Sequence, residues 1–583
     1  MSSKPFNMKT ILPRKRVRRL TVAICAIVLF FAYVCLVNEM SKPTYVTIMR
    51  ISWFRLLRIP LPAVKEVLLA TTILVIIASV LEGSTTNELM IQLILIILCL
   101  ISYLANVGTW LSLISFVLVV YASKSEYRKL LETFLVVITA ISIGALIRHL
   151  AYFVLGDEPF VHSSWIVAEI HLTLLTSLQP LSMLAYALLP ILPLISYALE
   201  RTRLIKAIEK RLPQTSWRLS KRSSLALLAV SLVISLSYNT LTYLPSVNPR
   251  GTPIGVDISL YRVRLEKMVR GFVIEILRRY PYEMFYLIML YWIQCITGLA
   301  PMTIAKFMPV LLFPLLTLST YYMMLNLTEN RSIATLSALL TATGPQVTVG
   351  SYSSFQANAL ALTLGYTTLG VYLSRQGDTS AALISLLFLM ISELTHPWAT
   401  AHVLAALILL HLSQGRSALR RRAPVILAGL IGVGIGDAIR YIVVQGARGG
   451  SAHVTGVSLM LMLRELQANI MRYPYTLYRV VSLYYGGLLN YPLALLVLAL
   501  PILRSAKIKR FVTSWCITTL PEYFVAEMFT PRILYNVPIG ALLALTINKL
   551  FGNNASLRNS LLVISLSYAT LSLVNIVPPW GRA

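Results

Sequence analysis

Asp257 is an acidic residue whose surroundings could support chemistry. It follows Pro253 and Gly255 in a segment that comes soon after a long apolar run. A carboxylate near a lipid surface loses hydration, which raises its pKa and makes it a stronger general base, whereas a nearby arginine lowers that pKa. Aspartate is also a favoured N-cap residue, here for a helix that would begin at Ile258. The residues alone leave both roles open.

Glu393 and His396 form a second candidate, in Ser-Glu-Leu-Thr-His-Pro-Trp at the end of an apolar run. Their i, i+3 spacing predicts that both side chains lie on one face of a helix. A di-metal site in a helical bundle needs two Glu-x-x-His motifs and further carboxylates, and we find one such motif. We therefore expect this pair to line an aqueous cavity, and we predict no metal ligands.

Asp437 and Arg440 lie in a helix-like apolar stretch that also carries glycines at positions 429, 432 and 436. Ionisable groups at membrane depth are costly, so each is a candidate functional group by default. The spacing of the glycines favours close packing against another helix. An internal ion pair is therefore the simpler role for Asp437 and Arg440.

Arg532 follows Glu522 and Glu527 in a late segment rich in proline and aromatic residues. An arginine in a membrane-facing loop suits a phosphate group, because its planar fork donates paired charge-assisted hydrogen bonds. The alternative is that the long side chain anchors the segment at the membrane interface.

The elements that must position these residues are transmembrane helices. The chain has 583 residues, is 57% hydrophobic and only 13% charged, and its mean hydropathy is +0.74. A soluble domain carries about 25% charged residues. Because backbone polar groups in lipid must be satisfied within the chain, runs of about 20 apolar residues predict helical spans. We count about 16–18 such spans, which predicts an all-α polytopic transmembrane bundle.

The net charge of +29 does not indicate nucleic-acid binding, because the basic residues cluster at the ends of apolar runs. Such clusters mark cytoplasmic loops and can contact anionic lipids. Five scattered cysteines show no spacing of a disulfide framework or a metal site.

Charge bias divides the chain into three parts and predicts its topology, with the N-terminus in the cytoplasm. Residues 1–199 form a multi-span block of unassigned role. Residues 200–222 form a basic cytoplasmic linker, and residues 223–583 form a larger membrane module.

Within the larger module, a span at about Ser223–Leu244 leads into an outer segment, 245–282. We expect a helix from Ile258 to Arg279 to lie on the membrane surface, and Met284–Leu299 to be re-entrant or horizontal. The same counting places Asp257, His396 and Arg532 on one face of the membrane.

From about Ser223 onward, the order of features resembles the GT-C class of membrane glycosyltransferases, of a prokaryotic, archaeal-like kind. The resemblance covers about 360 residues and depends on the arrangement of motifs. The motifs are Gly255-Val-Asp257 with Tyr261, Tyr280-Pro-Tyr-Glu-Met-Phe-Tyr-Leu leading to Thr297-Gly-Leu-Ala-Pro301, Ala305-Lys-Phe-Met-Pro-Val-Leu-Leu, and Pro531-Arg532-Ile-Leu-Tyr535-Asn-Val-Pro538.

The resemblance implies a transferase that uses a polyprenyl-phosphate-linked sugar and acts on the extracytoplasmic face. It implies that Asp257 is the catalytic base and that Arg532 binds the donor phosphate. The residues expected to line the cavity are Tyr261, Glu393, His396 and Tyr535. The implied partners are the donor, membrane lipids, and a lipid, glycan or protein acceptor. Some relatives carry an acidic pair where this chain has a lone aspartate, so a divalent-metal cofactor stays an open question.

Two other classes of function fit parts of the sequence. A transporter or lipid flippase would use Glu393, Asp437, Arg440 and Glu522 as a substrate or proton path, although we find no convincing internal repeat of the kind transporters often show. A scaffold that recruits other enzymes would account for the N-terminal block.

Overall fold

The computed structural model describes mainly residues 185–202, 217–245, 257–353, 355–374, 379–445, 495–525 and 529–552, with isolated residues between them and the short stretches 46–47 and 58–59. The chain forms two compact units. The first comprises Met1–Arg148, Asp157–Leu181 and Ser556–Ser567, and the second comprises His149–Gly156, Ser182–Ala555 and Tyr568–Ala583. The predictions for residues 1–184, apart from 46–47 and 58–59, lie outside the described residues.

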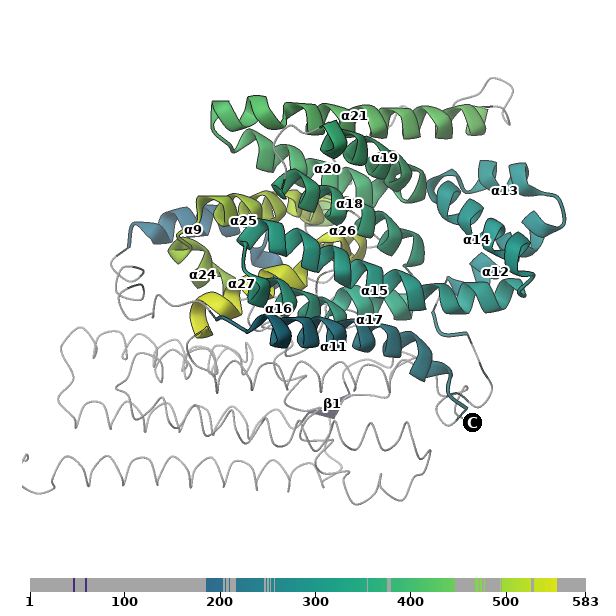
Figure 1. Ribbon diagram of the computed structural model, residues 1–583, viewed down its shortest axis with the longest axis horizontal. Coiled ribbons are helices and arrows are strands. Elements are labelled where there is room, and N and C mark those ends of the chain that lie inside the picture. Colours follow the sequence, from purple (N-terminus) through teal and green to yellow (C-terminus); the bar gives the residue numbers. More distant parts are fainter. Residues whose placement is uncertain are drawn as a thin grey trace, which may run out of the picture. The chain divides into compact units, whose positions relative to one another are not determined.

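The described part of the second unit is helical, which confirms the all-α class (Figure 1). Its helices are α9 (Leu192–Glu200), α11 (Lys221–Thr240), η2 (Leu241–Tyr243), α12 (Ile258–Val269), α13 (Val273–Arg279), η3 (Pro281–Glu283), α14 (Met284–Thr297), α15 (Pro301–Thr328), α16 (Arg331–Ala342), α17 (Pro345–Ser353), α18 (Gln356–Ser374), α19 (Thr379–Thr395), α20 (Pro397–Leu412), α21 (Arg416–Gln445), α24 (Leu496–Ile502), α25 (Ala506–Thr518), η6 (Leu520–Tyr523), α26 (Thr530–Asn536) and α27 (Ile539–Phe551). In the first unit, β1 (Val46–Thr47) and β2 (Arg58–Ile59) pair antiparallel.

Three described helical segments are long and apolar enough to cross a membrane: Lys221–Tyr243, Pro301–Thr328 and Leu419–Val444. A fourth span forms if the bent pair α26 and α27, which meet at 56°, crosses as one. The segment Lys221–Tyr243 confirms the span expected near Ser223–Leu244. The chain is thus a helical membrane protein.

The core of the second unit forms where α15 packs against α11, α16 and α18. Nearly all residues of α16 are buried, and their side chains are small or apolar. Its N-cap, Asn330, accepts a hydrogen bond from the Ser332 backbone amide at 2.9 Å. Small residues permit such burial because they let helix backbones approach closely. At one such contact, a Cβ on Gly540 of α27 would lie 2.4 Å from Thr341 Oγ1.

Helices α19 and α21 pack closely through the glycines of α21, as predicted. A Cβ on Gly432 would lie 2.2 Å from the Leu386 carbonyl oxygen, and one on Gly436 would lie 3.0 Å from the Met390 carbonyl oxygen. At Gly429 the nearest atoms, at 2.8 Å, belong to Leu389 and Ser385.

The surface helix expected from Ile258 to Arg279 is broken into α12 and α13, so that prediction is wrong in its continuity. Gly271 adopts φ +98° at the break, a conformation that only glycine adopts without strain. Helix α12 buries Tyr261, Leu265 and Met268, whereas Leu260, Val263 and Val269 of the same helix are exposed. Figure 1 shows α12, α13 and α14 together at one end of the described helices.

Helix α14 has 14 residues, which corresponds to about 21 Å at 1.5 Å per residue. The hydrocarbon core is about 30 Å thick, so α14 is too short to cross it alone. Gly298 ends the helix in the left-handed conformation, and the chain then enters α15 at Pro301. This length agrees with the expectation that Met284–Leu299 is not a simple span.

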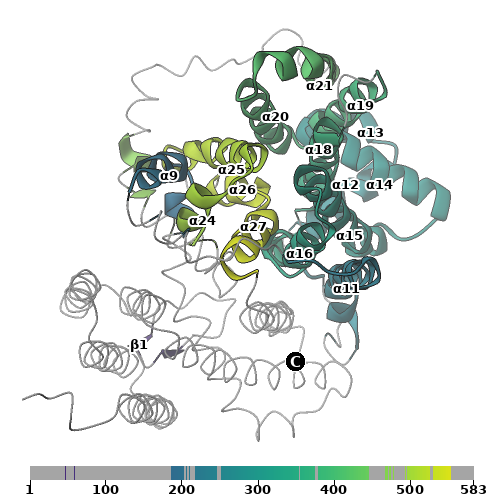
Figure 2. The same ribbon diagram turned by 60° about the vertical axis from the view of Figure 1, so that its left-hand side comes forward.

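Residues before the predicted boundary at 199 pack within the second unit. Helix α9 packs against α24 and α25, as Figure 2 also shows. The Lys509 ammonium pairs with Glu200, and the Tyr523 hydroxyl donates to the Ala187 carbonyl. The described residues 185–199 therefore fold with the C-terminal module, although the charge pattern places them in the N-terminal block.

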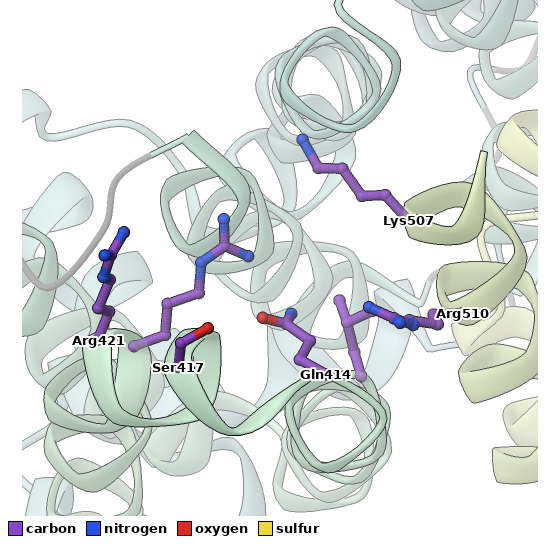
Figure 3. Close-up of a pocket in the computed structure, with 7 residues that line it drawn as sticks. Gln414, Ser417, Arg421, Lys507 and Arg510 are labelled. Carbon is purple, nitrogen blue, oxygen red and sulfur yellow. The ribbon is translucent and has the colours of Figure 1, made fainter.

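Basic side chains gather where α20 ends and where α21 and α25 begin. A cavity of about 220 Å³ lies there (Figure 3). It is lined by Leu410, Gln414, Ser417, Arg421, Arg422, Lys507 and Arg510. In the same part of the unit, the Trp217 backbone amide donates to Asn548 Oδ1 at 3.1 Å.

Candidate active site

The loop before Asp257 is held against α11 and α15. Lys306 of α15 donates a hydrogen bond to the Gly251 carbonyl, and its ammonium lies 5.4 Å from the centre of the Tyr243 ring. The Ile254 backbone amide donates to the Tyr243 hydroxyl at 3.1 Å. Gly251 and Gly255 have φ of +55° and +125°, so the turns of this loop require glycine.

Asp257 occupies the N-cap position of α12, but its side chain makes no capping hydrogen bond. Its backbone is in the right-handed helical region, with φ −91° and ψ −3°, whereas a capping residue usually adopts extended values. The described residues offer the carboxylate no ion pair or hydrogen bond. Of the two roles left open by the sequence, the cap is therefore wrong, and the carboxylate is available to a ligand.

Two arginines lie close enough to influence the charge on Asp257. Burial raises the pKa of Asp257 above its ordinary value, and the charges of Arg264 and Arg532 partly offset that rise. A half-buried carboxylate with a raised pKa is a better general base than one in water.

Arg264 and Glu283 form the second part of the site. Arg264 lies on the buried face of α12, seven residues after Asp257, and its guanidinium pairs with the Glu283 carboxylate. The same guanidinium stacks 3.8 Å from the centre of the Tyr280 ring. Burial raises the pKa of Glu283, and Arg264 lowers it in turn. The charge of Glu283 is thus balanced by Arg264, whereas Asp257 has no such partner among the described residues.

Sequence reasoning did not identify Arg264 as a site residue. Its signal is a lone arginine among Ile258, Tyr261, Leu265 and Met268, the residues that α12 buries. Buried charges are almost always paired, so an arginine on an apolar helix face predicts an acidic partner. The identity of that partner depends on the fold.

Tyr261, expected to line a cavity, is buried against its neighbours. Its ring meets Tyr286 edge to face at 5.1 Å. The Tyr286 hydroxyl donates to Gln356 Oε1, and Gln356 Nε2 donates to the Ala305 carbonyl at 3.0 Å. This network joins α12 and α14 to the starts of α15 and α18, and so fixes the helix that carries Asp257 and Arg264.

Arg532 reaches the site from α26, about 275 residues further along the chain. Its positive charge lowers the pKa of Asp257 and of Glu283. The described acidic residues form no ion pair with Arg532. The guanidinium is therefore available to an anion that enters beside Asp257.

His396 is the N-cap of α20, and its Nδ1 accepts a hydrogen bond from the Ala399 backbone amide at 3.2 Å. Burial and the charge of Arg532 lower the pKa of His396 to about 3. The ring is therefore neutral at pH 7, and with Nδ1 as acceptor it carries its proton on Nε2. The charge of Arg532 thus acts on both Asp257 and His396, and their common membrane face stays a prediction.

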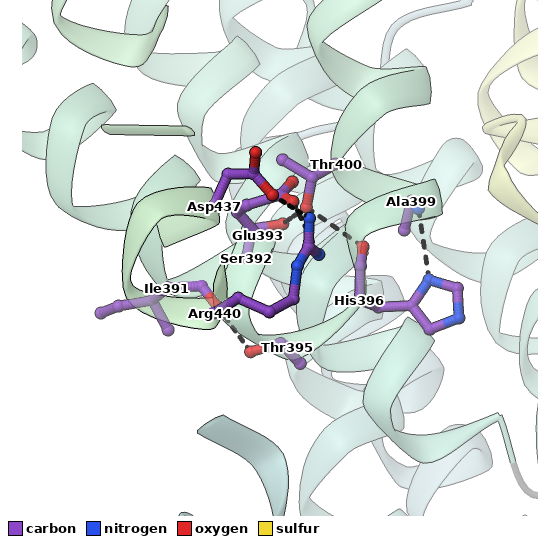
Figure 4. Close-up of polar contacts among 9 residues, drawn as sticks. All are labelled: Ile391, Ser392, Glu393, Thr395, His396, Ala399, Thr400, Asp437 and Arg440. Atoms are coloured by element: carbon purple, nitrogen blue, oxygen red, sulfur yellow. Dashed lines mark hydrogen bonds and ion pairs between the residues drawn. The ribbon is translucent and has the colours of Figure 1, made fainter. Parts of the chain in front are cut away.

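Glu393 and His396 do not share a helix face, so that prediction is wrong. Helix α19 ends at Thr395, and His396 adopts an extended backbone with φ −161°. Figure 4 shows the His396 ring directed away from Glu393. Glu393 instead pairs with Arg440 of α21 at 2.9 Å.

Asp437 completes this contact by pairing with Arg440 three residues along α21. Arg440 thus lies between two carboxylates at the packed α19–α21 interface. The ion pair expected for Asp437 and Arg440 is confirmed and includes Glu393, although it is not internal, because the Asp437 side chain is 63% exposed. Because each of these three side chains is already engaged by another in the group, a structural role is favoured for all of them.

Tyr535 and Glu522 are buried away from any described cavity. The Tyr535 hydroxyl donates to the Gln346 carbonyl at 2.8 Å, which ties α26 to α17. Glu522 accepts a hydrogen bond from the Tyr473 hydroxyl at 2.9 Å, and complete burial raises its pKa well above the ordinary range of a glutamate. Glu527 lies outside the described residues.

No three His, Cys, Asp or Glu side chains gather to form a metal site within the part of the chain that the structure describes. The Glu283 carboxylate is already paired with Arg264. Among the described residues neither Asp257 nor Arg532 forms an ion pair, and such a carboxylate and guanidinium can accept a proton and stabilise a developing negative charge.

Comparison with known proteins assigns no family. No protein-family model matches the chain, and no curated protein matches it. Among solved structures, the chain is similar to the single-particle cryo-EM structure of arabinofuranosyltransferase AftD from Mycobacteria, with a TM-score of 0.35 and 14% identity. The similarity covers 63% of this chain and 28% of that one, so the chain spans less than a third of its length.

Proposed function

We propose that this protein is a membrane glycosyltransferase of the GT-C kind, which transfers a hexose or pentose from a polyprenyl-phosphate-linked donor to a hydroxyl-bearing lipid, glycan or protein. The observation that carries the proposal is that, among the described residues, neither the Asp257 carboxylate nor the Arg532 guanidinium forms an ion pair, while the charge of Arg532 acts on Asp257. Asp257 lies at the end of the unit where α12, α13 and α14 gather (Figure 1), and the charge of Arg532 on α26 acts on it. We place this end on the extracytoplasmic face.

The reaction requires a base on one side of the anomeric carbon and a cation on the other. Asp257 accepts the proton of the acceptor hydroxyl, whose oxygen forms a bond to the anomeric carbon. The bond from that carbon to the donor phosphate oxygen breaks, and its electron pair leaves with the lipid phosphate. Arg532 stabilises the negative charge that develops there, and the neutral His396 offers Nε2–H as a further donor.

Arg264 and Glu283 position this site. Their ion pair places a neutralised acid beside Asp257, so a single unpaired carboxylate remains to act as base. Their pairing also leaves Arg532 free to bind the phosphate. The membrane supplies the donor lipid laterally, and the exposed apolar residues of α12 to α15, such as Phe272 and Trp292, suit contact with lipid.

The test is sugar transfer by the purified full-length protein in lipid, with a panel of polyprenyl-phosphate sugars and a pool of membrane lipid and glycan acceptors. Asp257→Asn should reduce transfer by about 10²–10⁴-fold, the usual contribution of a general base. Glu266→Gln is the matched control, because Glu266 lies on the same helix, 41% exposed, and pairs with Arg262 at 3.6 Å.

The outcomes separate the mechanism from the class of protein. Transfer that survives in Asp257→Asn but is lost in Glu283→Gln would move the base to Glu283. If no donor supports transfer but purified protein moves lipid-linked sugars across vesicles, the protein is a flippase, and the proposal is wrong. Arg532→Gln should lower the rate by about 10²–10³-fold, as expected for loss of one stabilising donor.

A further inference from the structure

The basic cavity between α20, α21 and α25 lies far from the candidate active site. Helix α15 connects the two regions: Lys306 near its start bonds to the loop before Asp257, and the Asn326 carbonyl near its end accepts a hydrogen bond from Lys507 at 2.7 Å. Twenty residues separate these two positions, or about 30 Å along a helix. The cavity and the candidate active site are thus separated by about the thickness of the hydrocarbon core.

Four cations line this cavity: Arg421 and Arg422 from α21, and Lys507 and Arg510 from α25. None of the described residues that line it is acidic. Figure 3 shows Arg421 on one side of the cavity and Arg510 and Lys507 on the other. The described acidic residues form no ion pair with Arg510. Cations that repel one another in a small space create a strong positive potential.

The walls of the cavity are built by specific contacts. Gln414 Nε2 donates to the Tyr372 hydroxyl at 2.9 Å, and the Arg422 guanidinium lies 5.0 Å from the centre of the Tyr372 ring. Lys507 is held by the Asn326 carbonyl and lies 3.7 Å from Glu329, whose side chain is 86% exposed. Burial lowers the pKa of Lys507, Glu329 partly restores it, and the charge of Arg422 lowers it further.

We propose that this cavity binds a phosphate-bearing anion, either the head group of an anionic lipid or a soluble phosphate compound. Three guanidinium groups and one ammonium can give paired hydrogen bonds to phosphate oxygens. The volume of about 220 Å³ is below the roughly 300–1,000 Å³ of pockets that hold drug-sized ligands, so it suits a compact group. Basic pockets between membrane helices bind lipid head groups in this way.

The test is the melting temperature of the full-length protein in neutral detergent, measured with two probes. Inorganic pyrophosphate represents the soluble source, and phosphatidylglycerol in mixed micelles represents the lipid source, with phosphatidylcholine as the uncharged comparison. The wild type should be stabilised by at least one anionic probe and not by phosphatidylcholine. The probe that acts identifies the source.

Variants localise the binding to the cavity. Arg421→Gln combined with Arg510→Gln should raise the probe concentration needed for half of the stabilisation at least about tenfold, as expected for two lost charge-assisted contacts. Lys221→Gln combined with Arg331→Gln is the matched control, because it removes two exposed cations that do not line the cavity. Ser417→Glu adds a negative charge at an exposed lining position and should also abolish the response without disturbing the fold.

Three results would overturn the proposal. One is the absence of stabilisation of the wild type by either anionic probe. Another is an equal loss of response in both double variants, which would show general attraction to a basic surface. The third is an unchanged response in Ser417→Glu.

Discussion

Gly432→Ala should separate α19 from α21, because the added methyl group has no room. The new Cβ would lie 2.2 Å from the Leu386 carbonyl oxygen, 3.0 Å from its carbonyl carbon and 3.1 Å from its Cα. All three are backbone atoms, which cannot rotate away as a side chain would. Overpacking of this kind costs about 1–3 kcal/mol. On the same helix, a Cβ at Gly434 would meet no atom within 4 Å.

Gly434→Ala is therefore the matched control for Gly432→Ala. Both changes gain the same helix propensity, up to about 1 kcal/mol, so this gain cancels when the two variants are compared. Gly432→Ala should be about 1–3 kcal/mol less stable than Gly434→Ala, which for a chain of 583 residues corresponds to a melting temperature lower by about 1–2.5 °C. The measurement is thermal unfolding of both proteins in the same detergent.

The same pair of variants tests whether this interface supports the candidate active site. Separation of the two helices strains the contact between Arg440 and Glu393 and moves the end of α19, which leads directly to His396. Sugar transfer should fall in Gly432→Ala and persist in Gly434→Ala. Equal melting temperatures for the two variants would refute the reasoning about close packing.

Three further predictions follow from charge and orientation. Burial raises the pKa of Asp257, and the charge of Arg532 lowers it in part. The acid limb of the pH profile of kcat/KM should therefore lie above the ordinary aspartate pKa of about 3.9. Arg532→Gln should move this limb to still higher pH, and a shift of the limb to lower pH would contradict the assignment of Asp257 as the base. The pKa of Glu522 is raised in the folded protein, so the folded state favours the protonated carboxyl. The free energy of unfolding is therefore undiminished below the pKa of glutamate in the unfolded chain, about 4.3. It falls as the pH rises from there toward the pKa of Glu522 in the folded protein. Glu522→Gln should therefore melt higher than the wild type at pH 8 and equally at pH 4, and the opposite order at pH 8 would disprove a neutral Glu522. In a cysteine-free background, Lys267→Cys should react with a membrane-impermeant reagent from outside and Ser417→Cys should not; the reverse pattern would place the candidate active site on the cytoplasmic side.

The sequence by itself determined the class of the protein and several local features. Long apolar runs specify membrane helices because unsatisfied backbone groups are too costly in lipid, and the Lys221–Tyr243 segment lies where such a run predicts it. The glycines of α21 predict close packing because their spacing places them on one helix face. Both features depend on residues that are neighbours in the chain, so a local pattern is sufficient to reveal them.

Tertiary structure decided which charges meet. Arg264 pairs with Glu283 rather than Asp257, and Glu393 pairs with Arg440 rather than turning toward His396. The break at Gly271 separates α12 from α13, although their polarity pattern is continuous. Electrostatic energy falls with distance in space, and that distance is fixed by how helices cross, often hundreds of residues apart. The sequence shows which groups are ionisable, but only the packing of the helices shows that, among the described residues, neither Asp257 nor Arg532 forms an ion pair.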